Sequence, residues 1–197
     1  MRRVLARLSR VVTTSTQAPD YSSINEEVEL EMERQLRRRE RRMGLKDSEE
    51  LLRTAPVGRL GMSWKNKPYV VPLTFVYNDG RIYLHSAKRG KKMVSLAKNP
   101  RVCFEVDQLI RIKTSDSPCS FSAYYRSVIV SGKARRIKMV HKKALILRKL
   151  TEKYTRKTGE STFDKNELER VEVVEIIPRR ITGKQNLPPD KQHARAP

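Results

Sequence analysis

The chain has 197 residues, enough for one domain with a sizeable core and short extensions but too few for a second full domain. Its formal net charge of +21 predicts attraction to polyanions or to a phosphorylated ligand, because basic surfaces concentrate anions. No apolar run is long enough to cross a bilayer, so we expect a soluble protein with no membrane partner. Cys103 and Cys119 are too few and too far apart for a zinc cluster or a disulfide framework, which favours a reducing compartment.

Residues 1–23 have the composition of a basic, flexible leader. Their arginines begin at Arg2 and Arg3, and no acidic residue precedes Asp20. A mitochondrial transit peptide has the same arginine-rich, acid-free character, so mitochondrial import is an alternative to a cytoplasmic location.

Residues 24–46 have the pattern of a charged helix. Apolar residues recur at every fourth position from Ile24 to Leu36, and no proline or glycine interrupts the run. Glutamates come first and arginines last, which is the order that the helix dipole favours. We therefore expect an N-terminal helical extension over residues 24–43 that Gly44 ends.

The pattern then changes from helix to strand. Asp47 and Glu50 predict a capping box at the start of a short helix, DSEELLRTA. Alternating β-branched and aromatic residues predict strands at 58–64, 69–77, 81–86, 102–106, 124–137 and 171–182. Helical periodicity interrupts them at 88–98 and 139–154. We expect a mostly β (α+β) fold whose six strands suffice for a barrel, followed by a proline-rich disordered tail at 185–197.

A candidate anion site lies where the strand 81–86 gives way to a helix. The free N–H groups of a first helical turn, with Gly90 before Lys91 and Lys92, could bind one phosphate, although a solvated basic helix start has the same sequence. The spacing matches neither a P-loop nor a dinucleotide fingerprint. Pro72 in the preceding hairpin predicts an edge or a bulge, whose unpaired backbone groups could contact a flat ring. A phosphorylated ring system, with FMN as the first candidate, fits both features.

The chain resembles the FMN-binding split-barrel family related to pyridoxamine 5′-phosphate oxidase, and within it the branch that includes the nitroimidazole-resistance proteins. The resemblance lies in GRLGMSWKNKPYVVPLTFVYNDGRIYLHSAKRGKKMVSLAKNPRVCFEV, in YYRSVIVSGKARRI and in VEVVEIIPRRITGK. It covers roughly residues 47–184 and implies a six-stranded antiparallel split β-barrel over that range. It also implies a homodimer that holds FMN in a groove between its subunits.

The resemblance further implies the cofactor-binding residues. One group meets the isoalloxazine ring, a second lines it, a third holds the phosphate around Lys92, and a fourth comes from the facing strand, plausibly of the partner subunit. These groups are, in order, Val71, Pro72, Leu73 and Thr74; His85, Ser86 and Ala87; Gly90, Lys91 and Lys92; and Tyr125, Arg126 and Ser127. The pattern assigns no catalytic residue and no metal ligand.

Some positions depart from the family pattern. Ser131 stands where relatives often have phenylalanine, and Arg89 makes the phosphate loop more basic. The late Arg-x-His pair of the vitamin-forming oxidases is missing, because Ile181 and Thr182 follow Arg180. This argues against vitamin synthesis. Trp64 lies in an expected turn, where we expect a dimer or lid contact.

The leading hypothesis is a flavin-dependent oxidoreductase that passes hydride or electrons from FMN to a small acceptor of the nitro or quinone type. A haem-binding protein with His85 as iron ligand, or a deazaflavin-binding protein, is an alternative in the same fold. The third hypothesis is a nucleic-acid binder, based on the net charge and the arginine run at 37–42. The sequence shows no basic strip interleaved with aromatics, so we expect only non-specific, salt-sensitive binding.

Overall fold

The computed structural model describes residues 38–117, 120–155 and 163–192. The predicted leader and residues 24–37 of the predicted N-terminal helix lie outside these ranges. Contacts divide the chain into two units, residues 1–39 and 40–197, and the fold below is that of the second unit.

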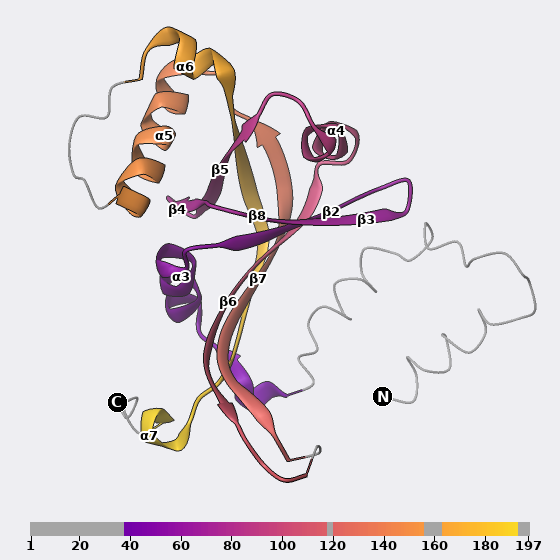
Figure 1. Ribbon diagram of the computed structural model, residues 1–197, viewed down its shortest axis with the longest axis vertical. Coiled ribbons are helices and arrows are strands. Elements are labelled where there is room, and N and C mark those ends of the chain that lie inside the picture. Colours follow the sequence, from indigo (N-terminus) through magenta and orange to yellow (C-terminus); the bar gives the residue numbers. More distant parts are fainter. Residues whose placement is uncertain (1–37, 118–119, 156–162, 193–197) are drawn as a thin grey trace, which may run out of the picture. The chain divides into compact units, whose positions relative to one another are not determined.

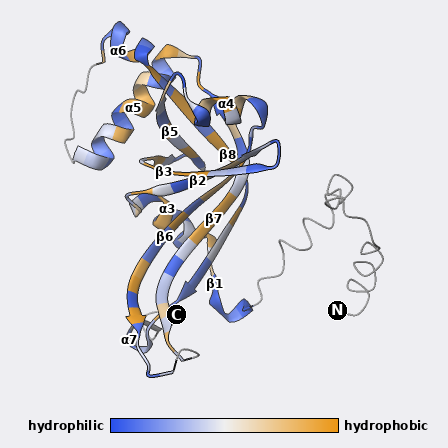
Figure 2. Ribbon diagram, turned by 45° about the vertical axis from the view of Figure 1, so that its right-hand side comes forward, coloured by the Kyte–Doolittle hydropathy of each residue, from blue (hydrophilic) through white to orange (hydrophobic). Residues whose placement is uncertain are grey.

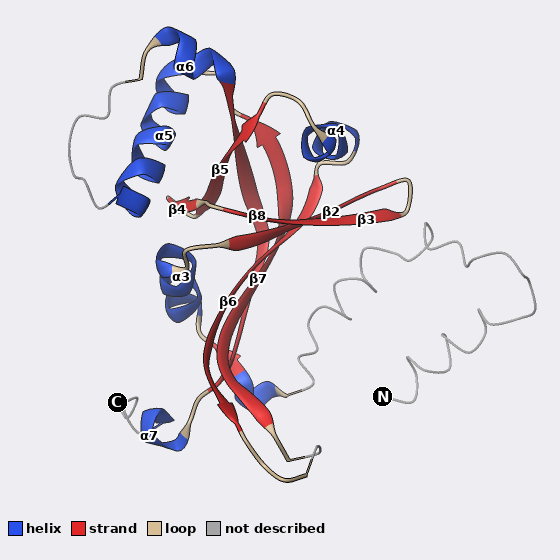
Figure 3. Ribbon diagram, viewed as in Figure 1, coloured by secondary structure: helices blue, strands red, loops and turns tan. Residues whose placement is uncertain are grey.

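This unit is one antiparallel sheet with helices beside it (Figures 1 and 3). The strands are β1 (Arg42–Met43), β2 (Gly58–Trp64), β3 (Lys67–Leu73), β4 (Val76–Asn78), β5 (Arg81–Ala87), β6 (Arg101–Lys113), β7 (Ser122–Arg136) and β8 (Val171–Asn186). The helices are α3 (Leu45–Thr54), α4 (Lys91–Lys98), α5 (Val140–Thr155), α6 (Lys165–Arg170) and α7 (Pro189–Gln192), and a 3₁₀ turn covers Arg39–Arg41. No helix in the described ranges is long and apolar enough to span a membrane.

The strand order forces the sheet to curl. The strands follow each other as β3-β2-β6-β7-β8-β5-β4, and β1 pairs with β8. β3 and β4 are therefore the two ends of the sheet, yet only Thr74 and Phe75 connect them in sequence. Because this short link holds the two ends close together, the sheet bends into an open barrel, and no ladder between β3 and β4 closes it within the described residues. The expected mostly β, split-barrel class is confirmed, but the sheet has eight strands within the described residues rather than the six expected.

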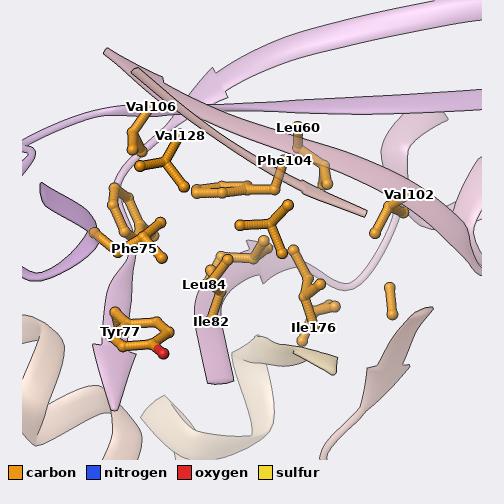
Figure 4. Packing of buried hydrophobic residues seen from close by; sticks show 14 of the residues in the cluster. Leu60, Phe75, Tyr77, Ile82, Leu84, Val102, Phe104, Val106, Val128 and Ile176 are labelled. Carbon is orange, nitrogen blue, oxygen red and sulfur yellow. The ribbon is translucent and has the colours of Figure 1, made fainter. Parts of the chain in front are cut away.

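The interior of the curl is the main apolar core (Figure 4). Phe75, from the link between the sheet ends, meets Phe104 of β6 edge to face, with ring centroids 4.9 Å apart. Both rings are fully buried. Gly58 gives Phe104 its space, since a Cβ there would lie 2.1 Å from the ring. The link that joins the two sheet ends is thus also anchored in the core.

A second core lies between the outer face of the sheet and helices α5 and α6. Side chains alternate along β5, so Ile82 and Leu84 face the main core while Tyr83 faces the second core. Leu147 and Leu150 of α5 pack in the same outer cluster. The helix predicted at 139–154 is confirmed as α5, with Ala144, Leu147 and Leu150 toward the sheet, but Val140 at its start is exposed.

A buried carboxylate connects the outer face of the sheet with α5. Glu175 of β8 has no exposed surface and accepts hydrogen bonds from Arg81 at 2.8 Å, Lys142 at 3.0 Å and Tyr83 at 3.1 Å, and from Arg135 Nε. Burial alone would raise the pKa of this carboxyl, but these hydrogen bonds outweigh it and lower the pKa to about 2. The ionised side chain therefore links β5, β7, β8 and α5.

The helix starts differ from the sequence prediction. α3 begins at Leu45 with Gly44 as its N-cap, so Asp47 lies inside the helix and the predicted capping box is wrong. Gly44 is the N-cap residue and has an extended backbone. Ser48 Oγ donates a hydrogen bond to its carbonyl oxygen at 2.7 Å. A capping box does occur in α6, where the side chain of Asp164 accepts from the backbone of Glu167.

The two ends of the domain also differ from the sequence prediction. Arg42 and Met43, expected in the N-terminal helix, instead form β1 and pair with Lys184 and Gly183. β8 continues to Asn186 and α7 follows, so residues 185–192 of the expected disordered tail are ordered, while residues 193–197 lie outside the described ranges. Gln185 and Asn186 are held in β8 by pairing with Arg126 and Tyr125 of β7, backbone partners that the local sequence does not reveal.

Candidate cofactor-binding site

The turn between β5 and α4 presents unpaired backbone amides. Gly90 is the N-cap of α4 and has a φ of 124°, a conformation that residues with a side chain rarely adopt. α4 therefore begins at Lys91 rather than at residue 88 as predicted. The first bond of the helix runs from Val94 N to Gly90 O at 3.1 Å, so the preceding amides of the first turn have no acceptor within the helix.

Lys92 places a positive charge next to these amides, and His85 lies close to it. Lys92 is half-buried, and burial lowers its pKa. The pKa of His85 is lowered first by burial and second by the charge of Lys92. In the described part of the chain neither side chain has an acidic partner. An unneutralised ammonium group beside helix N–H groups is the arrangement that binds phosphate.

β3 lies beside the start of α4. Lys91 Nζ is 4.3 Å from the centre of the Tyr69 ring, which connects the helix start to β3. Val71 and Leu73 pack against the main core, while Pro72 points to solvent. β3 pairs only with β2, so Pro72 does lie in an edge strand, and the regular register between these strands contains no bulge.

A hollow of about 560 Å³ adjoins His85 on the outer side of the sheet. This volume lies within the usual range for small-molecule sites, roughly 300–1,000 Å³. The hollow is mainly apolar and is lined by Thr74, His85, Leu147, Leu150, Thr151, Tyr154, Phe163, Glu167, Arg170 and Val171. It brings Thr74 and His85, which the resemblance assigned to the ring, to one place together with α5 and α6.

Two residues near the end of α5 fix the wall of the hollow. Tyr154 accepts a hydrogen bond from Phe75 N at 2.9 Å, and its hydroxyl lies 2.8 Å from Pro56 O. Lys153 donates to Ala55 O at 2.8 Å, and burial lowers its pKa to about 8. Neither residue was a sequence candidate. Only the helical period of α5 marked its apolar side, and that period does not show what the side covers.

The remaining residues at the end of β5 face different ways. Ser86 is buried on the side of the main core, whereas Ala87 is exposed and lies on the same face of β5 as His85. Of these three residues, only His85 lines the hollow.

Tyr125, Arg126 and Ser127 lie far along the sheet from His85. Ser127 pairs with Lys184 and His85 with Val173, positions 11 residues apart on β8, or about 36 Å of strand. Arg126 instead donates to the backbone carbonyl of Asp47 at 3.3 Å. One copy of the chain therefore does not bring these residues to the hollow.

Within residues 38–117, 120–155 and 163–192, no three His, Cys, Asp or Glu side chains are grouped so that they could hold a metal ion. The candidate site consists instead of amides, cations and an apolar wall, which suits a phosphorylated ring better than a metal.

The family model for pyridoxamine 5′-phosphate oxidase matches residues 45–185. The chain belongs to the pyridoxamine 5′-phosphate oxidase family. The match runs from α3 into β8, so it includes every candidate residue of this family member. No curated protein matches it.

Solved structures share the fold of this family member. A Bacteroides thetaiotaomicron protein named for 5-nitroimidazole antibiotic resistance has 25% sequence identity and a TM-score of 0.63, covering 72% of this chain and 83% of its own. A flavocytochrome from Azotobacter vinelandii has 22% identity and a TM-score of 0.66, with coverages of 75% and 70%. An FAD- and haem-binding protein from Mycobacterium smegmatis has 20% identity and a TM-score of 0.64, with 76% of each chain covered.

Proposed function

We propose that the chain is an FMN-binding flavoprotein and an oxidoreductase acting on a small acceptor. The observation that carries the proposal is the half-buried ammonium group of Lys92 at the first turn of α4. It has no acidic partner in the described residues and lies close enough to His85, on the wall of the hollow, to lower the pKa of that ring. Membership of the family supports a flavin, and the names of the similar structures include flavin-binding and haem-binding proteins.

The residues present fit this cofactor. Lys92 and the amides after Gly90 would hold the phosphate, because the cation and the helix N-terminus both attract it. Thr74, directly after the edge strand β3, and the ring of His85 would hold the flat ring because both line the hollow, whereas Val71 and Leu73 pack against the main core. A bound flavin supplies hydride or electron transfer, and the chain supplies its position and the exclusion of water.

A second copy of the chain would complete the site. Tyr125, Arg126 and Ser127 can reach a flavin at His85 only from another subunit, given their separation along β8. Exposed apolar side chains on the β6–β7 hairpin and on β7 support a protein partner for this region. They are Leu109, Ile112, Phe121 and Ile129. We therefore propose a homodimer.

The residues that line the hollow limit which class of electron acceptor could bind there. Leu147, Leu150 and Phe163 give it an apolar wall, and the ring of His85 is a polar group of the lining that could contact an acceptor oxygen. Because burial and Lys92 keep this imidazole neutral at neutral pH, it can donate one hydrogen bond without charging the site. Flat nitro compounds and quinones have this chemistry.

The absorbance spectrum of the purified chain, followed by mass analysis of the released cofactor, tests the proposal. Flavin bands and the mass of FMN are expected, with a dimer in sedimentation. The masses of FAD or a deazaflavin would correct the cofactor, and a Soret band would favour the haem alternative, in which the neutral imidazole of His85 could bind iron. A chain that stays colourless after incubation with FMN would refute the proposal.

A further inference from the structure

We propose that the end of the β2–β3 hairpin, with the neighbouring parts of α4, β6 and β7, binds single-stranded nucleic acid. We call this surface the basic patch, and it consists of Trp64, Lys65, Lys67, Lys98, Arg101 and Lys133. It lies at the opposite end of α4 from Lys92 and uses none of the residues assigned to the flavin. The inference is therefore independent of the proposed function.

An aromatic ring stands at the tip of the hairpin. Trp64 is 37% exposed, pairs with Lys67 across the turn, and has Lys65 Nζ 5.1 Å from its ring centre. An exposed ring beside ammonium groups is the arrangement on which the bases of single strands stack, because every base has a flat face and a nearby phosphate.

The turn itself keeps a lysine in an unfavourable conformation. Lys65 and Asn66 have φ angles of 52° and 55°, and the hairpin turn consists of these residues alone. Turns of this kind favour Asn-Gly or Asp-Gly, and a side chain such as lysine is uncommon at positive φ. A cation held at the tip against backbone preference points to a role for its charge.

Other cations are held beside the turn by the fold. Asn99 Nδ2 donates to Ser63 O at 2.8 Å, so the end of α4, with Lys98, lies next to the end of β2. The Asn99 side chain also accepts from the backbone of Arg101 at 3.1 Å. Arg101 pairs directly with Lys133 across β6 and β7. Like charges directly opposite each other in a sheet are unfavourable, and a bound polyanion would relieve the repulsion.

Acidic residues do not neutralise this surface. Residues 51–78, 80–104 and 117–151 contain no Asp or Glu. All the cations of the basic patch are exposed, and no ion pair joins them to an acid in the described ranges. In Figure 2 the end of the β2–β3 hairpin is largely hydrophilic. A single tryptophan among charges offers little apolar area for a membrane surface, so a nucleic acid is the better partner.

Trp64 is the only tryptophan of the chain, so its emission reports directly on the basic patch. The test is a titration of the full-length chain with a 20-nucleotide oligo(dT), following both the quenching of this emission and the anisotropy of a labelled oligo(dT). Saturable quenching is expected, together with a slope of log K against log salt of about −0.7 for each phosphate contacted. Binding without quenching would overturn the proposal.

Matched variants assign the binding to the patch. Trp64→Ala should weaken binding about fivefold or more, and Trp64→Tyr should keep most of the affinity because it still stacks. Lys98→Ala and Lys133→Ala should each reduce the salt slope by about 0.7. Lys113→Ala, with the same charge change at the other end of β6, is the control and should change the slope least.

Three results would overturn the assignment. Unchanged binding by the Lys98→Ala, Lys133→Ala double variant would mean that basic segments elsewhere hold the oligonucleotide. Binding to phosphatidylserine vesicles but not to oligo(dT) would make the patch a lipid surface. A change of oligomeric state in Trp64→Ala would make it a subunit contact. Circular dichroism checks that each variant is folded. If Trp64→Ala does not fold, the two lysine variants still test the proposal.

Discussion

The phenolic oxygen of Tyr154, near the end of α5, lies 2.9 Å from the backbone nitrogen of Phe75 in the link between the two ends of the sheet. Phe75 fills the main core, and its neighbour Thr74 lines the hollow. This hydrogen bond therefore connects the helix that forms one wall of the candidate site to the residue that holds the sheet curled.

Tyr154→Phe should destabilise the chain by about 1–3 kcal/mol, because Phe75 N–H loses its acceptor in a half-buried position. Urea unfolding measures the loss. Tyr124→Phe is the matched control, since no hydrogen bond of its hydroxyl occurs within the described ranges, and it should have little effect. Equal stability of the two variants would show that water replaces Tyr154 without cost.

Lys92→Ala should weaken FMN binding by at least about tenfold, because a charge-assisted hydrogen bond to the phosphate contributes about 1.5–3 kcal/mol. Its affinity for riboflavin, which lacks the phosphate, should not change. Lys98→Ala removes the same charge from the other end of α4 and should leave FMN binding within about twofold of the parent chain. Flavin fluorescence measures both affinities, and equal losses in the two variants would contradict the phosphate assignment.

The pKa of His85 should lie below the usual value in the flavin-free chain and rise when FMN binds. Burial and the charge of Lys92 lower it, whereas a nearby phosphate favours the protonated ring. A lowered histidine pKa makes protonation unfavourable in the folded state, so the chain should lose stability as the pH falls below the usual value. An NMR titration measures the pKa of His85, and the His85→Asn variant identifies which signal belongs to this ring. A pKa that does not move with FMN would place the phosphate elsewhere.

Glu175→Gln should destabilise the chain by about 1–3 kcal/mol, because a buried side chain loses charge-assisted hydrogen bonds from Arg81, Arg135 and Lys142, which are themselves partly exposed to water. Since folding lowers the pKa of this carboxyl to about 2, its contribution is complete above the unfolded pKa and is lost as the pH falls toward 2. The parent chain should therefore lose stability between about pH 5 and pH 2, and the variant should lose less over that range. Glu172→Gln on the same strand is the control for urea unfolding at each pH.

The strands were predictable because their side chains alternate along the sequence. β2 was predicted with its observed bounds, and β5, β7 and β8 began within two residues of the predicted positions. The break between β3 and β4 was missed, because Thr74 and Phe75 continue the apolar run while the backbone leaves one end of the sheet and enters the other. β1 was missed because it depends on a partner far along the chain.

The candidate site was predictable only as separate pieces. Motifs indicated the anion-binding turn at Gly90 and the ring-facing strand, since both are local in sequence. No local pattern shows that α5 and α6 cover His85, or that the end of α4 with Lys98 lies next to the end of β2 with Trp64. These surfaces are assembled from distant segments, and strand pairing together with helix packing decides which residues share them.

The position of β8 has a consequence for how the chain matures during synthesis. This last strand lies in the middle of the sheet, between β7 and β5. Until the ribosome has released it, β5 and β7 each present an unpaired edge, and the inner apolar residues of both halves lack their cover. Nascent chains stalled before residue 171 should consequently bind chaperones and fail to form a protease-resistant body.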